Sequence, residues 1–253
     1  MTRGPQTQAD ASVSPGHPLF EIIDDAYRTF DSPKPGSTGV CERCCMDAAI
    51  EDDFFNPPIR RLPLAYVQDW YCAAYDPEKG VPKETWVYLL PRILEILAAG
   101  EEPANVGTEI VLSRFQTGRP ENWTSEEWKV LDRFQRRYLA REIQSGIIQL
   151  DDVICMFYLA GWDLEDLLDQ VSSTPDAVLA ERLWQDWCKG RCPGDGRIWI
   201  TAFWKAPGNS LVFEYYTSQA LHDRMEACAL AHDTPPGLAA KASAVVSVIE
   251  ASR

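Results

Sequence analysis

Three cysteines within five residues, in the run Cys41-Glu42-Arg43-Cys44-Cys45, form the cluster whose residue types and spacing best suit a specific chemistry. Two cysteines separated by two residues can place both thiolates on one metal ion, or take part together in disulfide exchange. We therefore expect that, if this protein binds a metal, the metal is zinc and its ligands include Cys41 and Cys44. A structural zinc site needs four ligands, and no second Cys-x-x-Cys pair follows.

The missing zinc ligands could come from two later groups of residues. Cys188 and Cys192 flank a glycine turn, and Cys228 precedes His232 by four residues, a spacing that would place both on one face of a helix. The structural alternative is that the thiols pack as small apolar groups and that His232 caps a helix end. Cys45 could also act as the third thiol of an exchange reaction.

An acidic segment is a second candidate for cation binding. Glu165, Asp166 and Asp169 have the acidic-acidic-x-x-acidic order with which helical prenyl-transfer enzymes hold magnesium. Such enzymes need a second set of ligands facing the first, and the sequence offers none. Leucines at helical spacing explain the same segment as an amphipathic helix with acidic residues in its first turn.

The three histidines give little support for nucleophilic catalysis. His17 lies in a polar stretch, and His222 and His232 each precede an aspartate. Because adjacent side chains of a helix point apart, we expect neither His-Asp pair to form a catalytic base held by its partner. Gly-x-Ser-x-Gly and phosphate-binding glycine motifs are missing from the sequence. The sequence therefore names no catalytic residue, and whether the protein is an enzyme stays open.

Hydrophobic residues at helical spacing recur along most of the chain. They predict an all-α fold with about nine to eleven helices in an irregular or solenoid-like array. Residues 1–18 are polar and predict a flexible extension, and residues 19–253 predict a single helical domain. Strand-forming side chains at 198–204 leave a short β-hairpin within 197–216 as an alternative to a helix that starts after Asn209.

Particular residues predict how some of these helices begin, bend and pair. Pro91 lacks an amide hydrogen and predicts a kink or two abutting helices in the most apolar segment. Asp151 and Asp152 are expected to cap one helix, and Thr124 with Glu127 forms a capping box that opens a long one. We expect the arginines of the long helix to pair with acidic residues between 151 and 186, each exposed pair contributing about 0–1 kcal/mol. These arginines are Arg133, Arg136, Arg137 and Arg141.

Three segments together resemble a family of uncharacterised bacterial helical proteins. They are Cys41-Glu42-Arg43-Cys44, Pro58-Ile59-Arg60-Arg61-Leu62 and Leu89-Leu90-Pro91-Arg92-Ile93-Leu94-Glu95. The resemblance would cover most of residues 41–253, and it implies an all-helical fold without an assigned activity, cofactor or catalytic residue. Similar sequences are expected to carry a Trp-Gly step and a histidine before the third segment. Here Trp86 precedes that segment with neither.

Composition and charge narrow the range of partners. Of the 253 residues, 45% are hydrophobic and 25% charged, the ordinary balance of a globular protein. The net charge of −14 and the pI of about 4.6 argue against nucleic acid or an anionic membrane surface as the main partner. We find neither a signal-peptide core near the start nor the roughly 18 consecutive apolar residues of a membrane span. Cysteines placed singly in apolar segments predict the reducing cytoplasm.

By elimination, these features favour an interaction or regulatory module with a protein partner. One alternative is a zinc-binding or thiol-active protein that uses Cys41 and Cys44, and another is a small helical enzyme with an acidic magnesium site. A closed pocket lined by charged residues would favour the enzyme, and a broad exposed apolar patch would favour the module. The sequence specifies neither the partner nor the oligomeric state.

Overall fold

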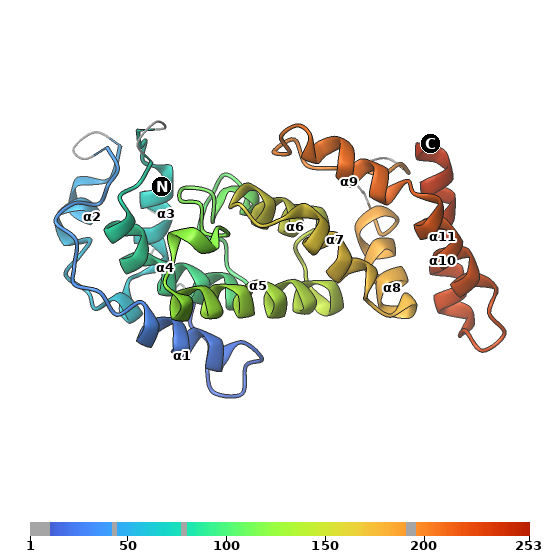
Figure 1. The fold of residues 1–253 in the computed structure, drawn as a ribbon, viewed down its shortest axis with the longest axis horizontal. Coiled ribbons are helices and arrows are strands. Elements are labelled where there is room, and N and C mark those ends of the chain that lie inside the picture. Colours follow the sequence, from blue (N-terminus) through green and yellow to red (C-terminus); the bar gives the residue numbers. More distant parts are fainter. Residues whose placement is uncertain (1–10, 42–44, 77–79, 191–195) are drawn as a thin grey trace, which may run out of the picture. The chain divides into compact units, whose positions relative to one another are not determined.

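A computed structural model describes residues 11–41, 45–76, 80–190 and 196–253 of the chain. Within these ranges it contains eleven α-helices, three 3-10 helices and no strand, which confirms the predicted all-α class (Figure 1). The chain divides into two compact units: unit 1 extends to Gln135, and unit 2 begins at Arg136. The boundary falls inside helix α5 (Ser125–Ser145), so no linker-like sequence marks it.

Unit 1 is built around the buried helix α4 (Lys83–Ala98), which contacts α1 (Phe20–Thr29). Thirteen of its residues are buried, and the helix continues through Pro91, so the alternative of two abutting helices is wrong. A proline removes one backbone donor, and packing on all sides of α4 outweighs that loss. The other elements of unit 1 are α2 (Ala48–Asp53), η1 (Ile59–Arg61), α3 (Leu64–Cys72), η2 (Thr108–Ile110), η3 (Pro120–Asn122) and the start of α5.

Arg92 carries a completely buried guanidinium in the middle of α4. Its Nε donates to the carbonyl of Leu62 at 2.8 Å, and its Nη1 donates to the carbonyl of Ala11 at 3.1 Å. The same Nη1 lies 2.8 Å from Oε2 of Glu95, one turn further along the helix. A buried charge is stable only when it is paired and fully hydrogen-bonded, and Arg92 meets that condition by holding distant segments of the chain.

The chain before α1 belongs to this buried network. Glu95 accepts the Tyr27 hydroxyl at 2.7 Å and the main-chain N–H of Val13 at 3.3 Å. Ala11, whose carbonyl Arg92 uses, is 4% exposed. For residues 11–18 the structure therefore differs from the expected flexible extension, because a buried ion pair in α4 takes hydrogen-bonding partners from this segment. Residues 1–10 lie outside the described part of the chain.

A second buried arginine, Arg114, closes the C-terminal end of α3. It donates to the carbonyls of Trp70 at 3.0 Å and Ala73 at 3.1 Å, and also to that of Tyr71. Its guanidinium lies 4.5 Å from the Trp70 ring centroid and 4.7 Å from that of Tyr75. Cations interact favourably both with the last carbonyls of a helix and with aromatic faces. Arg114 therefore fixes the end of α3.

Two fully buried tryptophans lie next to each other in the core of unit 1. The ring centroids of Trp70 on α3 and Trp86 on α4 are 6.1 Å apart, and the ring planes are inclined by 32°.

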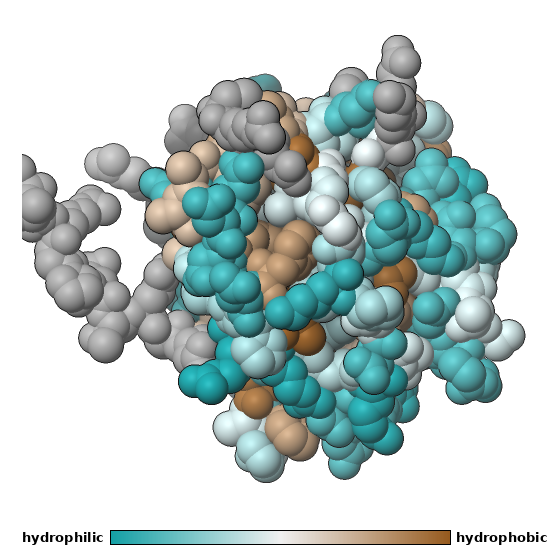
Figure 2. Space-filling model, turned by 90° about the vertical axis from the view of Figure 1, so that its left-hand side faces the viewer, coloured by the Kyte–Doolittle hydropathy of each residue, from teal (hydrophilic) through white to brown (hydrophobic). Residues whose placement is uncertain are grey.

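Figure 2 views the molecule from the side on which α2 lies in Figure 1. Hydrophobic residues appear on that face in areas interrupted by hydrophilic ones, as expected when the large aromatic groups are used in the core.

Unit 2 is a set of helices in which α10 (Gln219–Leu230) and α11 (Pro236–Ser252) form a helical hairpin (Figure 1). Both helices of the hairpin contact α8 (Asp176–Trp187). Apolar side chains of these three helices are buried: Leu179, Leu183, Met225, Val245 and Ile249. The remaining helices are α6 (Leu150–Leu159), α7 (Leu164–Ser172), α9 (Gly208–Tyr216) and the end of α5.

The segment with strand-forming residues is neither strand nor helix. Residues 198–207 form turns and irregular structure, and α9 begins at Gly208, so the β-hairpin alternative is wrong. The buried carboxylate of Asp151 holds this segment by accepting the N–H of Thr201 at 2.6 Å and the indole N–H of Trp204 at 3.1 Å. Asp151 therefore does not cap α6 as expected; the N-cap residue is Gln149.

Two of the arginines of α5 have ion-pair partners outside the acidic residues expected for them. Arg133 forms an ion pair with Asp25 of α1, within unit 1. Arg141 lies 2.5 Å from the carboxylate of its neighbour Glu142 on the same helix. The partner of Arg133, 108 residues away, cannot be read from spacing in the sequence, because packing brings the two residues together.

Candidate functional site

The structure places only one of the two expected zinc ligands. Cys41 is half-buried, and its main-chain N–H donates to the carbonyl of Ala74 at 2.6 Å, just beyond the end of α3. Cys44 lies outside the described residues. Zinc binding by Cys41 and Cys44 therefore stays a prediction, and the same holds for an exchange reaction that involves Cys45.

The later ligands considered for that zinc do not form a described group. Cys188 is half-buried at the end of α8, and Cys192 lies outside the described residues. Cys228 is buried in α10, which ends at Leu230. The expectation that Cys228 and His232 share a helical face is therefore wrong, because the helix stops two residues before the histidine.

Unit 2 contains an open cleft of about 430 Å³ between the end of α5, α7 and the start of α8. This volume lies within the range of about 300–1,000 Å³ that is typical of ligand sites. The residues lining the cleft are Arg136, Ala140, Ile143, Gln144, Asp166, Asp169, Gln170, Ser173, Thr174, Pro175 and Val178. The cleft therefore combines side chains of both charges with a few apolar ones.

Two of the three residues in the acidic motif lie in this cleft. Asp166 and Asp169 line it from α7 and are exposed, and Arg136 lines it from α5. Among the described lining residues, the other walls carry no carboxylate that could complete a magnesium site. The arrangement instead suits a ligand with a positive group for the aspartates and a negative group for the arginine.

The first turn of α7 is fixed by Asp163. Its carboxylate accepts the N–H groups of Glu165 at 2.9 Å and Asp166 at 3.2 Å, as an N-cap residue does. This cap sets where the helix begins, and therefore which acidic residues reach the cleft. Asp166 and Asp169 are one turn apart and line it, whereas Glu165 does not.

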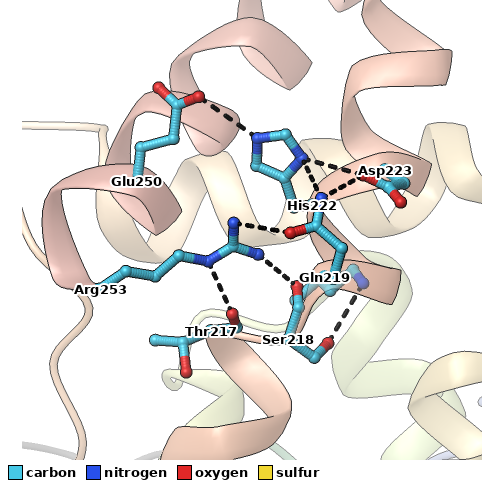
Figure 3. Close-up of polar contacts among 8 residues, drawn as sticks. Thr217, Ser218, Gln219, His222, Asp223, Glu250 and Arg253 are labelled. Atoms are coloured by element: carbon cyan, nitrogen blue, oxygen red, sulfur yellow. Dashed lines mark hydrogen bonds and ion pairs between the residues drawn. The ribbon is translucent and has the colours of Figure 1, made fainter.

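A second cluster of charged residues surrounds His222 on α10. Its Nδ1 lies 3.2 Å from Oδ1 of Asp223, and its Nε2 lies 3.3 Å from Oε1 of Glu250 on α11 (Figure 3). The expectation that His222 and Asp223 point apart is wrong. His222 is buried, 8% exposed, between the two helices of the hairpin, and in that position its two ring nitrogens reach carboxylates on opposite sides.

Gln219 and Arg253 connect the ends of the two helices around this cluster. The Gln219 side-chain amide donates to Asp223 Oδ1 at 2.6 Å, and its oxygen accepts from Arg253 Nη1 at 3.1 Å. Arg253 also donates to the carbonyls of Thr217 and Ser218, each at 2.9 Å (Figure 3). The C-terminal end of α11 is thereby held against the N-terminal end of α10.

Hydrogen bonds to Asp223 and Glu250 raise the pKa of His222 above its usual value, because both carboxylates favour the charged imidazole. Glu226 stands one turn further along α10, and His222, Asp223 and Glu226 offer ligand atoms within 4.8 Å of one another. The cluster can therefore hold either a proton on the imidazole or a divalent cation. Its His-x-x-x-Glu spacing was visible in the sequence, whereas Glu250, 28 residues from His222, was not.

Comparisons with protein-family models, with curated proteins and with solved structures find no match for this chain. The resemblance to a bacterial helical family therefore stays an expectation. In the part of the chain that the structure describes, no helix is both long enough and apolar enough to span a membrane. The functional argument consequently rests on the geometry of unit 2.

Proposed function

We propose that this protein is an interaction module that binds, in the cleft of unit 2, a short segment of a protein partner that carries a lysine or arginine. The observation that carries the proposal is the composition of the cleft. It is open, its volume is about 430 Å³, and Asp166 and Asp169 line it together with Arg136. A segment in which a lysine or arginine lies close to a carboxylate would match these charges.

The apolar part of the cleft supports the same class of ligand. Ile143 is buried, Val178 is half-buried, and both line the cleft beside the charged residues. Lysine and arginine have long aliphatic stems that pack on apolar surface while their charged heads reach a carboxylate. The net charge of −14 would also accelerate association with a basic partner.

The openness of the cleft favours binding over catalysis. Asp166 and Asp169 are exposed, whereas catalytic carboxylates usually work where water is excluded. We also propose the cytoplasm as the location of the protein. Cys155 in α6 and Cys228 in α10 are buried in the helical core, where a thiol packs as a small apolar side chain.

A peptide-binding experiment tests the proposed function. Fluorescence polarisation would follow the binding of labelled peptides with a central lysine or arginine and a neighbouring glutamate to the full-length protein. We expect the double variant Asp166→Asn/Asp169→Asn to weaken binding about tenfold or more, the typical loss when charge-assisted hydrogen bonds are removed. Acetylation of the peptide lysine should weaken binding in the same way.

Glu165→Gln is the matched control for this experiment. It removes one negative charge from the same turn of α7, outside the cleft lining. Equal weakening by Glu165→Gln would show general attraction to an acidic protein and would contradict a specific site. Unchanged binding in the double aspartate variant would remove the cleft from the proposal. Circular dichroism of each variant would verify that the helices remain folded.

A further inference from the structure

The His222 cluster brings together the residue types of a metal site, separately from the cleft. His222, Asp223 and Glu226 offer one nitrogen and two carboxylate oxygens within 4.8 Å of one another. Two ligands on a tetrahedral ion, each at a bond length of about 2.0–2.1 Å, are about 3.3–3.4 Å apart. The observed distance from His222 Nδ1 to Asp223 Oδ1 is 3.2 Å, so this pair already has nearly the required separation.

Glu250 provides a second observation, from a different helix. Its Oε1 lies 3.3 Å from Nε2 of His222, on the side of the ring opposite Asp223 (Figure 3). Histidines that bind metals characteristically donate their other N–H to a carboxylate, which fixes the tautomer and orients the ring. A proton on Nε2 leaves the lone pair of Nδ1 directed to the side where Asp223 lies.

The surroundings hold one of the ligands in place and give the site a negative charge. Gln219 donates to Asp223 Oδ1 at 2.6 Å, and Arg253 in turn donates to Gln219. Three carboxylates, from Asp223, Glu226 and Glu250, surround the imidazole, and Arg253, directly after α11, is the positive group that acts on it. The site is therefore net negative and favours a cation.

We propose that His222, Asp223 and Glu226 bind a divalent transition-metal ion of the zinc class and that Glu250 orients the imidazole. One imidazole nitrogen and two carboxylate oxygens are an established ligand set for such ions, with water in the remaining position. Since Glu250 belongs to α11 and the ligands to α10, metal binding would also stabilise the hairpin. This site is separate from the cleft and does not depend on the peptide-binding function.

Titration with Co²⁺ distinguishes this site from the cysteines. Co²⁺ bound by thiolates absorbs strongly in the near ultraviolet, whereas Co²⁺ bound by nitrogen and oxygen does not. We expect calorimetry of the reduced, full-length Cys41→Ser/Cys44→Ser variant to show a bound Co²⁺ without thiolate absorption. His222→Ala should abolish this binding, and Glu250→Gln should weaken it about 10–100-fold, the usual loss for a residue that orients a metal ligand.

Matched variants separate loss of the site from loss of the fold. His232→Ala removes the other histidine that precedes an aspartate and should leave Co²⁺ binding unchanged. Asp223→Asn changes an exposed side chain, 61% accessible, and should weaken binding even if His222→Ala proves unstable. Binding that survives both His222→Ala and Asp223→Asn would overturn the proposal, as would Co²⁺ binding only with the thiolate signal or no binding at all.

Discussion

Three arginines with less than a tenth of their surface exposed determine much of the irregular structure in this protein. Arg92, Arg114 and Arg182 are 0%, 6% and 3% exposed, and each donates to main-chain carbonyls outside regular hydrogen bonding. The guanidinium offers five donors in a fixed plane, so one side chain can satisfy several carbonyls at once. The described part of the chain contains no strand, and these arginine side chains supply the hydrogen-bond donors that loop carbonyls would receive from a neighbouring strand in a β-sheet.

The charge on His222 predicts a dependence of stability on pH in the metal-free protein. Asp223 first, and then Glu250, raise the pKa of His222 in the folded state, while Arg253 lowers it and Glu226 raises it further. The folded state therefore binds the proton more tightly than the unfolded chain, and the resulting stability is fully present below the unfolded pKa of about 6.5. It is lost as the pH rises through the folded pKa.

Urea unfolding in the presence of a chelator measures this effect. We expect the wild type to lose up to about 1 kcal/mol relative to His222→Gln between pH 6 and pH 9, the size typical of a partly exposed ion pair. His232→Gln is the control, and its difference from the wild type should not change with pH. A stability difference for His222→Gln that is constant or grows with pH would contradict the prediction.

At the scale of single helices, the sequence was sufficient to predict a helix where capping residues or hydrophobic residues at helical spacing mark it. The capping box is present as predicted: the N–H of Thr124 donates to Glu127 at 2.7 Å, and the N–H of Glu127 donates to Thr124 at 3.3 Å. The start of α7 is likewise set by a local cap, the side chain of Asp163. Such signals act over three or four residues, so one sequence window contains both partners.

The segment before α9 shows where local signals fail. Its β-forming residues suggested a strand, but the partner of Thr201 and Trp204 is Asp151, 50 and 53 residues earlier in the chain. A strand propensity describes side chains that fit a half-buried surface, and a loop packed on α6 offers the same surroundings. The contact of Asp151 with Thr201 and Trp204 could not be predicted because these residues are far apart in the sequence, and not because of their residue types.

Substitution of Asp151 by alanine tests the role of this contact. The change leaves the N–H of Thr201 and the indole N–H of Trp204 without their acceptor, and each unsatisfied buried donor costs about 1–3 kcal/mol. We expect Asp151→Ala to reduce the free energy of unfolding by about 2–4 kcal/mol and to raise hydrogen exchange in residues 198–207. Lys205→Met, an exposed change in the same segment, should do neither; similar stability in both variants would contradict this role.

At the scale of the whole molecule, the position of the boundary between the two units explains why the sequence predicted a single domain. A domain boundary is usually visible as a flexible linker rich in proline, glycine or polar residues, and here it falls inside the helix α5. For the sites, the sequence predicted that arginines of α5, Arg136 among them, pair with acidic residues between 151 and 186, but it could not show that Arg136, Asp166 and Asp169 line one cleft. It likewise showed His222 without revealing that Glu250 completes the cluster.

Division into two units predicts that a defect in one has limited effect in the other. Arg114→Met removes the cation that closes α3, so we expect hydrogen exchange in α3 and α4 to rise about tenfold or more. Exchange in α10 and α11, which belong to unit 2, should change by less than about twofold. Mass spectrometry of exchanged peptides measures both. Equal acceleration in the two units would show that the chain unfolds as one cooperative body.

The tryptophan pair of unit 1 also has an optical consequence. Two indoles at 6.1 Å with planes inclined by 32° are close enough for their electronic transitions to couple. The coupled pair should give a bisignate exciton band in the ultraviolet circular dichroism spectrum, and that band should vanish when α3 and α4 separate. The protein would thus carry an intrinsic chromophore for the folding of unit 1, readable without any attached dye.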